Sequence, residues 1–258
     1  MLSVSDLNFS HKLSKTKILS HVDFALEPGQ LTVILGPNGS GKTTLFKCLC
    51  GLWPASSGSI KLDSRELTSL SSAELARIVA VVPQDHEPPF AYSVLDAVLL
   101  GRTAHVGLFA APSSHDYDLA EAALADVGIS HLKDKPYTQI SGGERQLTLV
   151  ARALAQDTPL MFLDEPTSHL DYRNQTRVLT TVRRIMAEKG LTVLMTLHDP
   201  NLALHYADKA VLLEKGHVVV SGPAEAVITA KNLSRMYDLS LEVVRHAGGS
   251  FICLKGAA

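Results

Sequence analysis

The chain has 258 residues and is 46% hydrophobic, which suits one large α/β domain or one domain with an insert. Its net charge of −2 comes from 24 basic and 26 acidic residues without blocks of either sign, which argues against a nucleic-acid-binding surface. The longest apolar stretches are only strand-length and the start lacks the regions of a signal peptide, so we expect a chain that is kept in the cytosol.

The first part of the chain is predicted to consist mainly of short strands. The apolar and β-branched runs predict strands near Leu2–Phe9, Ile18–Leu26, Leu31–Leu35 and Ile78–Val82. A helix is expected at Lys42–Cys50 and a short helix at Ser71–Arg77. The three cysteines do not form a disulfide framework, and packing is the better interpretation of Cys48 and Cys50.

Residues from about 87 to 154 carry helical signals and few strand signals, which predicts a mainly helical insert in an α/β core. Helices are expected at Ser93–Arg102, Asp116–Val127 and from Ser141 through Leu154. Alternation then resumes, with strands at Leu160–Leu163 and Leu191–Leu197 and helices at Tyr172–Lys189 and Asn201–Ala207. A hairpin of Ala210–Leu213 with His217–Ser221 follows, and then a tail of two short helices and a further hairpin.

A phosphate-binding pattern lies between the third predicted strand and the first helix. It fits G-x-x-x-x-G-K-[ST] with the residues Gly36, Pro37, Asn38, Gly39, Ser40, Gly41, Lys42 and Thr43. The glycines let backbone N–H groups point at phosphate oxygens, and the helix N-terminus adds partial positive charge. We expect Lys42 to contact the β- and γ-phosphates and the Thr43 hydroxyl to ligate Mg²⁺, with Thr44 as a further ATP contact. The alternative is a glycine-rich turn without a ligand.

Four predicted strands each end directly before residues whose side chains or backbone can bind a ligand or take part in a reaction. They run into the phosphate loop, into Gln84, into Asp164 with Glu165, and into His198. Ligands of open α/β sheets bind at the carboxyl ends of the strands, so this coincidence predicts one site.

Each of these residues has a predicted role. Asp164 suits a carboxylate that binds Mg²⁺, and Glu165 can polarise the attacking water as a general base. Gln84 can ligate Mg²⁺ or hold a water, and His198 can contact the γ-phosphate. The alternatives are structural: Asp-Glu-Pro opens a turn, Gln84 is a polar turn residue, and His198 starts a turn.

The segment Ser141, Gly142, Gly143 and Glu144 supports two interpretations that do not compete. Ser-x-x-Glu predicts a capping box that starts a helix. A Gly-Gly helix start is also an anion site, and the helical insert separates it from the phosphate loop. We therefore expect it to serve a phosphate held by another copy of the chain.

With these residues identified, the chain resembles the ATP-binding cassette (ABC) ATPases over nearly its whole length. The matching motifs are Walker A at Gly36–Thr43, the Q-loop at Gln84, the signature at Ile140–Glu144, Walker B at Leu160–Glu165, the D-loop at Ser168–Asp171 and the H-loop at His198. Ile140 and Glu144 replace the usual leucine and glutamine, a variant common in importer subunits. His11 stands where the family places an aromatic residue that stacks on adenine, and imidazole offers less stacking area.

The resemblance implies a fold and a set of ligands. It implies one ABC ATPase domain over 1–258, with a RecA-like P-loop core at 1–86 and 156–258, a mainly parallel sheet and an N-terminal antiparallel β part. Residues 87–155 would form the helical signature subdomain. ATP and Mg²⁺ are the implied ligands, and Asp171 of the D-loop joins the implied ATP contacts.

The resemblance also implies partners. Two subunits would face head to tail as a homodimer, and separate membrane permease subunits would dock on about 87–102, at the cytoplasmic face of the inner membrane. A substrate-binding protein would complete the system. Phrases such as Val81–Gln84, Gly101-Arg102 and Leu163–Asn174 are similar to importers of iron chelates, haem and cobalamin, with molybdate importers close by. An ABC exporter, a soluble ABC ATPase and a P-loop kinase are the alternatives, and a kinase would not explain Ser141–Glu144 or His198.

Overall fold

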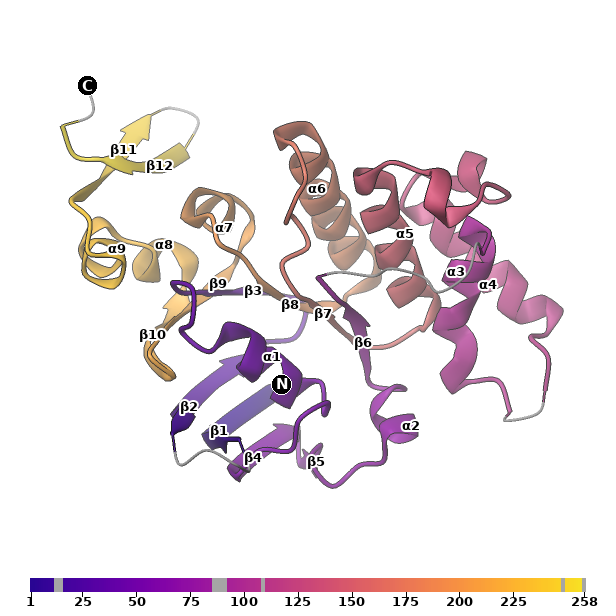
Figure 1. Cartoon of the computed structure of the whole chain (residues 1–258), viewed down its shortest axis with the longest axis horizontal. Coiled ribbons are helices and arrows are strands. Elements are labelled where there is room, and N and C mark those ends of the chain that lie inside the picture. The colour runs from indigo at the N-terminus through magenta and orange to yellow at the C-terminus, as the bar shows by residue number, and fades with distance from the viewer. Residues whose placement is uncertain (12–15, 85–91, 108–109, 247–248, 257–258) are drawn as a thin grey trace. The chain divides into compact units, whose positions relative to one another are not determined.

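The computed structural model describes residues 1–11, 16–84, 92–107, 110–246 and 249–256. The chain divides into two compact units (Figure 1). The first unit consists of Met1–Leu70 and Thr192–Ala258, and the second of Ser71–Leu191. None of the helices in the described ranges combines the length and the apolar character that a membrane crossing needs. The predicted subdomain limits at 87 and 155 stay a prediction.

An antiparallel sheet begins the first unit, as expected for the N-terminal part. Its strand order is β2-β1-β4-β5, with bounds β1 (Leu2–Ser10), β2 (Lys17–Leu26), β4 (Ser57–Leu62) and β5 (Arg65–Glu66). The sequence did not predict β4 and β5. Strand β4 is polar and buries only Ile60, and it exists because it pairs with β1, a contact that local patterning does not reveal.

A buried strand lies between the two strands with which it pairs in parallel in the first unit. β3 (Leu31–Leu35) has all five residues buried and pairs in parallel with β8 (Thr192–Thr196) and β9 (Lys209–Glu214). β9 turns back into β10 (His217–Pro223) as the predicted hairpin. The fold class is therefore confirmed: mixed α/β with parallel strands and an antiparallel β part.

Helix α1 (Lys42–Leu49) follows β3 and buries Leu45, Phe46 and Leu49. Cys48 is buried on this helix, and Cys50 is buried just beyond its end. Burial raises the pKa of the Cys48 thiol to about 12, so the thiol stays protonated and serves packing.

The C-terminal part of the first unit contains a hairpin that is hydrogen-bonded to one helix. Its elements are α7 (Pro200–Tyr206), α8 (Ala224–Val227), α9 (Ala230–Tyr237) and a hairpin of β11 (Leu241–His246) with β12 (Gly249–Leu254). The Asn201 side chain of α7 pairs with the Ile252 backbone of β12 like a neighbouring strand. Its amide nitrogen donates to the Ile252 carbonyl at 3.2 Å, and its oxygen accepts from the Ile252 N–H at 2.7 Å.

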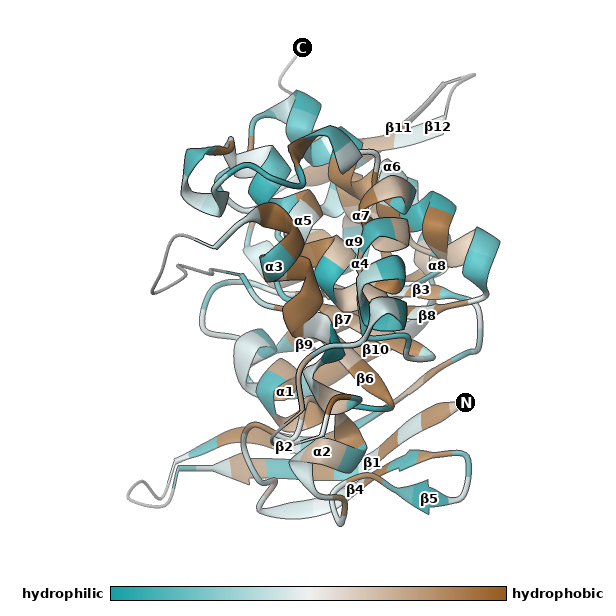
Figure 2. Ribbon diagram, turned by 90° about the vertical axis from the view of Figure 1, so that its right-hand side faces the viewer, coloured by the Kyte–Doolittle hydropathy of each residue, from teal (hydrophilic) through white to brown (hydrophobic). Residues whose placement is uncertain are grey.

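The second unit contains two parallel strands, β6 (Val79–Val82) and β7 (Leu160–Leu163). Figure 2 shows β6 as a hydrophobic strand, in agreement with its Val-Ala-Val-Val sequence. Helix α6 (Tyr172–Lys189) has the bounds that the sequence predicts, because Asp171 accepts from the Asn174 N–H at its start and Gly190 ends it with a φ of 67°.

Four helices of the second unit begin with the same device. Their bounds are α2 (Ser72–Leu75), α3 (Val94–Leu99), α4 (Ser114–Asp126) and α5 (Gly142–Ala155). Each has a serine N-cap and an acidic residue three positions later that form a complete capping box.

Three short 3₁₀ turns connect the helices, η1 (Leu100–Ala104), η2 (Ser130–Leu132) and η3 (Tyr137–Gln139). The helix predicted to run from Ser93 to Arg102 therefore ends as an α-helix at Leu99. Gly101 approaches the backbone of α5 at this point: a Cβ atom on Gly101 would lie 2.1 Å from the Arg152 carbonyl oxygen.

Candidate nucleotide-binding site

The loop between β3 and α1 is packed tightly against its surroundings. A Cβ atom on Gly36 would lie 2.2 Å from the Leu213 carbonyl oxygen and 2.6 Å from Ser40 Oγ. Gly41 precedes α1 with a φ of 103°, in the region that favours glycine. The absence of side chains at these two positions therefore lets β9 approach the loop and lets the chain turn into the helix.

Lys42 folds back over this loop. Its side chain is buried, and Nζ donates to the carbonyl oxygens of Gly36 at 2.7 Å and Pro37 at 3.2 Å. Ser40 Oγ is buried and has no hydrogen-bond partner among the described residues. The first N–H groups of a helix also lack partners within that helix. An ammonium, an unpartnered hydroxyl and a helix N-terminus on one loop fit a phosphate group.

His11 lies in a cluster of rings that the sequence did not predict. The His11 ring is edge-on to the rings of Phe9 and Trp53, with centroid separations of 5.3 and 5.2 Å. The Phe9 and Trp53 rings are stacked at 5.4 Å, and Lys47 Nζ lies 4.4 Å from the Trp53 ring centroid. The backbone N–H of Trp53 donates to the Lys47 carbonyl at 3.2 Å, so the cluster is attached to α1, which starts at Lys42.

Trp53 is the candidate residue that the sequence analysis missed. Only its rarity marked it, because it is the single tryptophan of the chain. Its position beside His11 depends on contacts between β1 and the segment after α1, such as the bond from the Ser56 N–H to the Asn8 carbonyl at 2.8 Å. Periodicity along the sequence does not report such contacts.

His198 follows β8 and is exposed. The N–H of its neighbour Leu197 donates to the Ile34 carbonyl at 3.2 Å, so β8 and β3 end at the same edge of the sheet. The next residue, Asp199, caps α7 by accepting from the Asn201 N–H at 2.7 Å. Asp199-Pro200 therefore starts a helix, and His198 lies at the strand edge from which the phosphate loop departs.

In the second unit, Gln84 and Glu165 meet beyond the ends of β6 and β7. Gln84 Nε2 donates to Glu165 Oε2 at 3.0 Å, and Ser168 Oγ donates to the same oxygen at 3.1 Å. The Asp164 N–H donates to the Val82 carbonyl at 2.9 Å, which fixes the register of the two strand ends. Asp164 and Glu165 are buried, with exposures of 6% and 9%.

Glu165 also has an uncommon backbone conformation. Its φ is 46°, in the left-handed region that side-chain-bearing residues rarely adopt. Such conformations persist where the surrounding structure determines them, and they concentrate at functional sites. Glu165 therefore differs in backbone conformation from the strand residues that precede it, and its carboxylate bonds to Gln84 and Ser168.

The predicted capping box at Ser141 is complete. The Ser141 N–H and hydroxyl donate to Glu144 Oε2 at 2.8 and 2.7 Å, and the Glu144 N–H donates back to Ser141 Oγ at 3.4 Å. The Ser141 hydroxyl and N–H hold the pKa of the Glu144 carboxyl below its ordinary value. Glu144 is therefore ionised at neutral pH and caps the helix start, and its predicted contact with ATP stays a prediction.

The two glycines of this segment contact the D-loop region of the same unit. A Cβ atom on Gly143 would lie 2.5 Å from Asn174 Oδ1, and one on Gly142 would lie 3.5 Å from Leu170 Cδ2. Gln175 Nε2 donates to the carbonyl oxygens of Thr167 at 3.3 Å and Leu170 at 3.0 Å. The start of α5 and the start of α6 therefore form one packed surface that includes Asp171.

The predicted site residues thus fall into two groups. The first unit holds the phosphate loop, His11 and His198, and the second unit holds Gln84, Asp164, Glu165, Ser141–Glu144 and Asp171. Each group is internally packed, and the roles of the individual residues stay predictions.

Comparison with known proteins identifies the family. The sequence profile of the ABC transporter family matches residues 19–168, which is more than half of the chain. The probable iron chelatin transport ATP-binding protein of Helicobacter pylori is 39% identical over 240 residues, 93% of this chain and 94% of that protein. The molybdate import ATP-binding protein MolC of Haemophilus influenzae is 38% identical over 240 residues, 93% of this chain and 89% of that protein.

A solved structure is similar over nearly the same extent. A chain of a metal-chelate type ABC transporter in an inward-facing conformation matches with a TM-score of 0.85 and 36% identity. The match covers 97% of this chain and 95% of that chain.

Proposed function

This chain belongs to the ABC transporter family of ATP-binding proteins, and we propose that it is the ATPase subunit of an importer for a metal chelate or a metal oxyanion. The observation that carries the proposal is the similarity to an iron chelatin transport ATP-binding protein and to a molybdate import ATP-binding protein, each across 93% of the chain, at 39% and 38% identity. ATP binding and ATPase activity belong to the family, and the importer role and its cargo are the steps that we add.

In the proposed site, the loop Gly36–Thr43 holds the phosphates of ATP. Lys42 leaves its two carbonyl partners and contacts the β- and γ-phosphates, and Ser40 Oγ and the N–H groups that start α1 complete the cradle. His11, supported by Trp53, stacks on adenine. Thr44 lies in the first turn of α1, next to this cradle.

The donors available for Mg²⁺ are the Thr43 hydroxyl, the Gln84 side-chain amide and the Asp164 carboxylate. All three can offer oxygen, the ligand atom that this hard cation prefers, so the residues present fit the ion. When bound, Mg²⁺ neutralises charge that develops on the phosphate oxygens.

Glu165 is the general base of the proposed reaction, with a carboxylate oxygen fixed by Gln84 and Ser168. It takes a proton from the water that attacks the γ-phosphorus. His198 donates a hydrogen bond to the γ-phosphate as negative charge develops there.

The anion site at Ser141–Gly143 serves the ATP of a second copy in the proposed head-to-tail homodimer. Gly142 and Gly143 are the first two residues of α5, so their N–H groups are among those at the helix start that lack a partner within the helix. In the proposed dimer they bind the incoming phosphate. Asp171 lies in the same packed surface and faces the second copy.

We propose that integral membrane permease subunits dock on about 87–102, and that the chain sits as a peripheral subunit at the cytoplasmic face of the inner membrane. Residues 87–91 lie outside the described residues. Within the described part of the segment, Leu100 is a large apolar side chain with 42% exposure. A substrate-binding protein delivers the cargo on the opposite side.

The proposed cargo is an iron chelate, haem or cobalamin, or an oxyanion such as molybdate. Relatives named for iron chelatin and for molybdate differ from this chain to nearly the same degree, 39% and 38% identity, so identity alone does not choose between them. The residues described above are proposed to bind the nucleotide or to contact a partner subunit, and none of them is proposed to contact the cargo.

Co-purification from membranes of the native host tests the proposal. The tagged chain is recovered after gentle solubilisation, and the proteins bound to it are identified by mass spectrometry. Recovery of a polytopic membrane subunit in equal amount supports the transporter role, and uptake of ⁵⁵Fe-chelate or ⁹⁹Mo-molybdate by vesicles then identifies the cargo. Recovery without a membrane partner would overturn the importer proposal and leave the ATPase assignment in place.

A further inference from the structure

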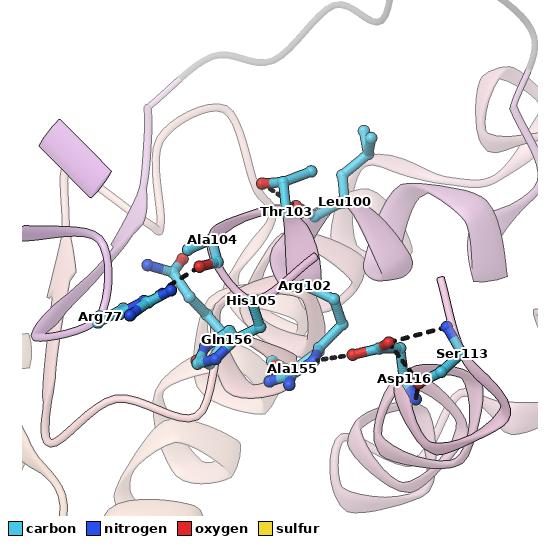
Figure 3. Close-up of polar contacts among 10 residues, drawn as sticks. All are labelled: Arg77, Leu100, Arg102, Thr103, Ala104, His105, Ser113, Asp116, Ala155 and Gln156. Carbon is cyan, nitrogen blue, oxygen red and sulfur yellow. Dashed lines mark hydrogen bonds and ion pairs between the residues drawn. The ribbon is translucent and has the colours of Figure 1, made fainter. Parts of the chain in front are cut away.

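Arg102 joins three elements of the second unit at a buried point (Figure 3). Its Nε donates to Asp116 Oδ1 at 2.9 Å, and its Nη1 donates to the Ala155 carbonyl at 2.8 Å. The side chains of Arg102 and Asp116 are 7% and 11% exposed. Arg102 belongs to η1, Asp116 to the first turn of α4, and Ala155 is the last residue of α5.

Asp116 is held in place independently of Arg102. Its Oδ2 accepts from the Ser113 N–H at 2.9 Å and from the Ser113 hydroxyl at 2.7 Å. The Ser113 hydroxyl first and the Arg102 guanidinium second keep the pKa of this carboxyl well below its ordinary value. The Asp116 carboxyl is therefore ionised at neutral pH, and its orientation is fixed.

A second set of bonds connects η1 with the start of β6. Gln156, the residue after α5, donates from Nε2 to the carbonyl oxygens of Ala76 and Val79. His105 Nε2 lies 2.9 Å from the Gln156 carbonyl oxygen, and Arg77 Nε donates to the Ala104 carbonyl at 3.2 Å. In Figure 3, Arg77, His105 and Gln156 lie to the left of Arg102, and Asp116 lies to its right. We call Arg102, Asp116, Ala155 and Gln156 the Arg102 junction.

The junction lies at the far ends of two elements that carry site residues. Helix α5 has 14 residues and a length of about 21 Å, with the Ser141 anion site at its N-terminal end and Ala155 at its C-terminal end. Strand β6 begins at Val79, beside Gln156, and ends two residues before Gln84. The junction therefore connects η1 with both elements.

We propose that Arg102 is a positioning residue that transmits the docking of a membrane subunit, through η1, to the Ser141 anion site and to Gln84. The inference rests on the proposed function, because it assigns the force on η1 to a partner that contacts exposed Leu100. Gly101 packs so closely against the α5 backbone that a Cβ atom on Gly101 would lie 2.1 Å from the Arg152 carbonyl oxygen. The Arg102 guanidinium stabilises this contact by donating hydrogen bonds to Asp116 and to the Ala155 carbonyl oxygen.

The test compares variants of the junction in the full complex. Asp116→Asn removes the charge and keeps the shape. Arg102→Lys keeps the charge but loses the planar fork whose two nitrogens donate separately to Asp116 and Ala155. Ser113→Ala leaves both charges and removes the hydroxyl that orients Asp116 and caps the start of α4. Glu121→Gln is the matched control, because it removes an exposed carboxylate from the same helix, where Glu121 pairs with Lys133 at 2.9 Å.

The readout is the ATPase rate of the chain in complex with its co-purified membrane subunits in lipid nanodiscs, divided by the rate of the same variant alone. Thermal unfolding confirms that each variant is folded. We expect Asp116→Asn and Arg102→Lys to lower this ratio at least fivefold, Ser113→Ala to lower it less, and Glu121→Gln to keep the wild-type ratio. The amount of membrane subunit recovered should stay near that of the wild type.

Three outcomes would overturn the inference. A wild-type ratio in folded Asp116→Asn and Arg102→Lys would make the junction purely structural while the proposed function stands. Loss of the membrane subunits themselves would make Arg102 part of docking rather than of transmission. If the wild-type chain recovers no membrane subunit, the proposed function fails, and this inference fails with it.

Discussion

Gln84 and Glu165 are 81 positions apart in the chain and meet in a hydrogen bond of 3.0 Å between the Gln84 side-chain nitrogen and Glu165 Oε2. Ser168 donates to the same oxygen at 3.1 Å. Two neutral donors thus orient a buried side chain. This arrangement suits a general base, because the proton acceptor is held in place.

Glu165→Gln should abolish turnover while ATP still binds. The amide has nearly the shape of the carboxylate and can accept the same two hydrogen bonds, but it cannot take a proton from water. Steady-state phosphate release should fall at least 100-fold, and gel filtration with ATP should show accumulated dimers. As a graded comparison, Ser168→Ala should slow turnover about tenfold, equivalent to ~1.4 kcal/mol. Unchanged phosphate release in Glu165→Gln would remove the residue from the role of base.

Lys42→Ala should abolish ATP hydrolysis and weaken ATP binding at least 100-fold. The ammonium is the cation placed over the phosphate loop, and its loss leaves the phosphate charge without its main partner. Isothermal titration with ATP and a phosphate-release assay measure both effects. Lys61→Ala, an exposed lysine on β4, is the control and should match the wild type. Hydrolysis within twofold of wild type would rule out the phosphate-loop assignment.

His11→Ala and Trp53→Ala should each raise the dissociation constant for ATP about three- to tenfold. Trp53 acts through the position of the His11 ring, so the double variant should be no weaker than either single variant. Equilibrium titration with a fluorescent ATP analogue measures the cycle. Inorganic tripolyphosphate lacks a base and should bind all four proteins equally. Additive losses would mean that the two rings contact the nucleotide separately.

Gly143→Ala should impair the anion site at the start of α5. The new methyl group would lie 2.5 Å from Asn174 Oδ1, so either the helix start or the Asn174 side chain must move. We expect ATP-dependent dimerisation to weaken about tenfold or more, measured by analytical ultracentrifugation in a Glu165→Gln background. Asn174→Ala removes the clashing atoms and should restore part of the loss in the double variant. No recovery in that variant would show that the glycine is needed for another reason.

Asp116 should make stability depend on pH in the acid range. Its folded-state pKa is lowered, so it contributes stability above its unfolded pKa of about 3.9, and this stability is lost as the pH falls through the folded value. The difference in unfolding temperature between wild type and Asp116→Asn should be constant above about pH 5 and shrink below about pH 4. Glu121→Gln should show no such trend. A difference that grows with acidity would reverse the assigned sign.

The sequence predicted best those elements whose limits are set locally. Helix α6 has the predicted bounds because Asp171 and Gly190 are start and stop signals in the chain itself. The phosphate loop was recognisable because its glycines, Lys42 and Thr43 occur at fixed spacing. In each case the physical cause lies within a few residues of its effect.

The sequence failed where distant segments decide the structure. Strand β4 depends on pairing with β1, and the end of α3 depends on the approach of Gly101 to the Arg152 backbone. The role proposed for Trp53 depends on its stacking against Phe9, a residue 44 positions earlier in the chain. These contacts follow from tertiary packing, and patterns along the chain do not encode them visibly.

The unequal burial of the three cysteines provides an optical reporter without mutagenesis. Cys48 and Cys50 are buried, whereas Cys253 is half-exposed on β12. A maleimide dye applied at neutral pH should therefore react at Cys253. Because Asn201 fastens β12 to the helix that starts two residues after His198, the fluorescence of that dye would follow the H-loop through a turnover cycle in the unmutated protein.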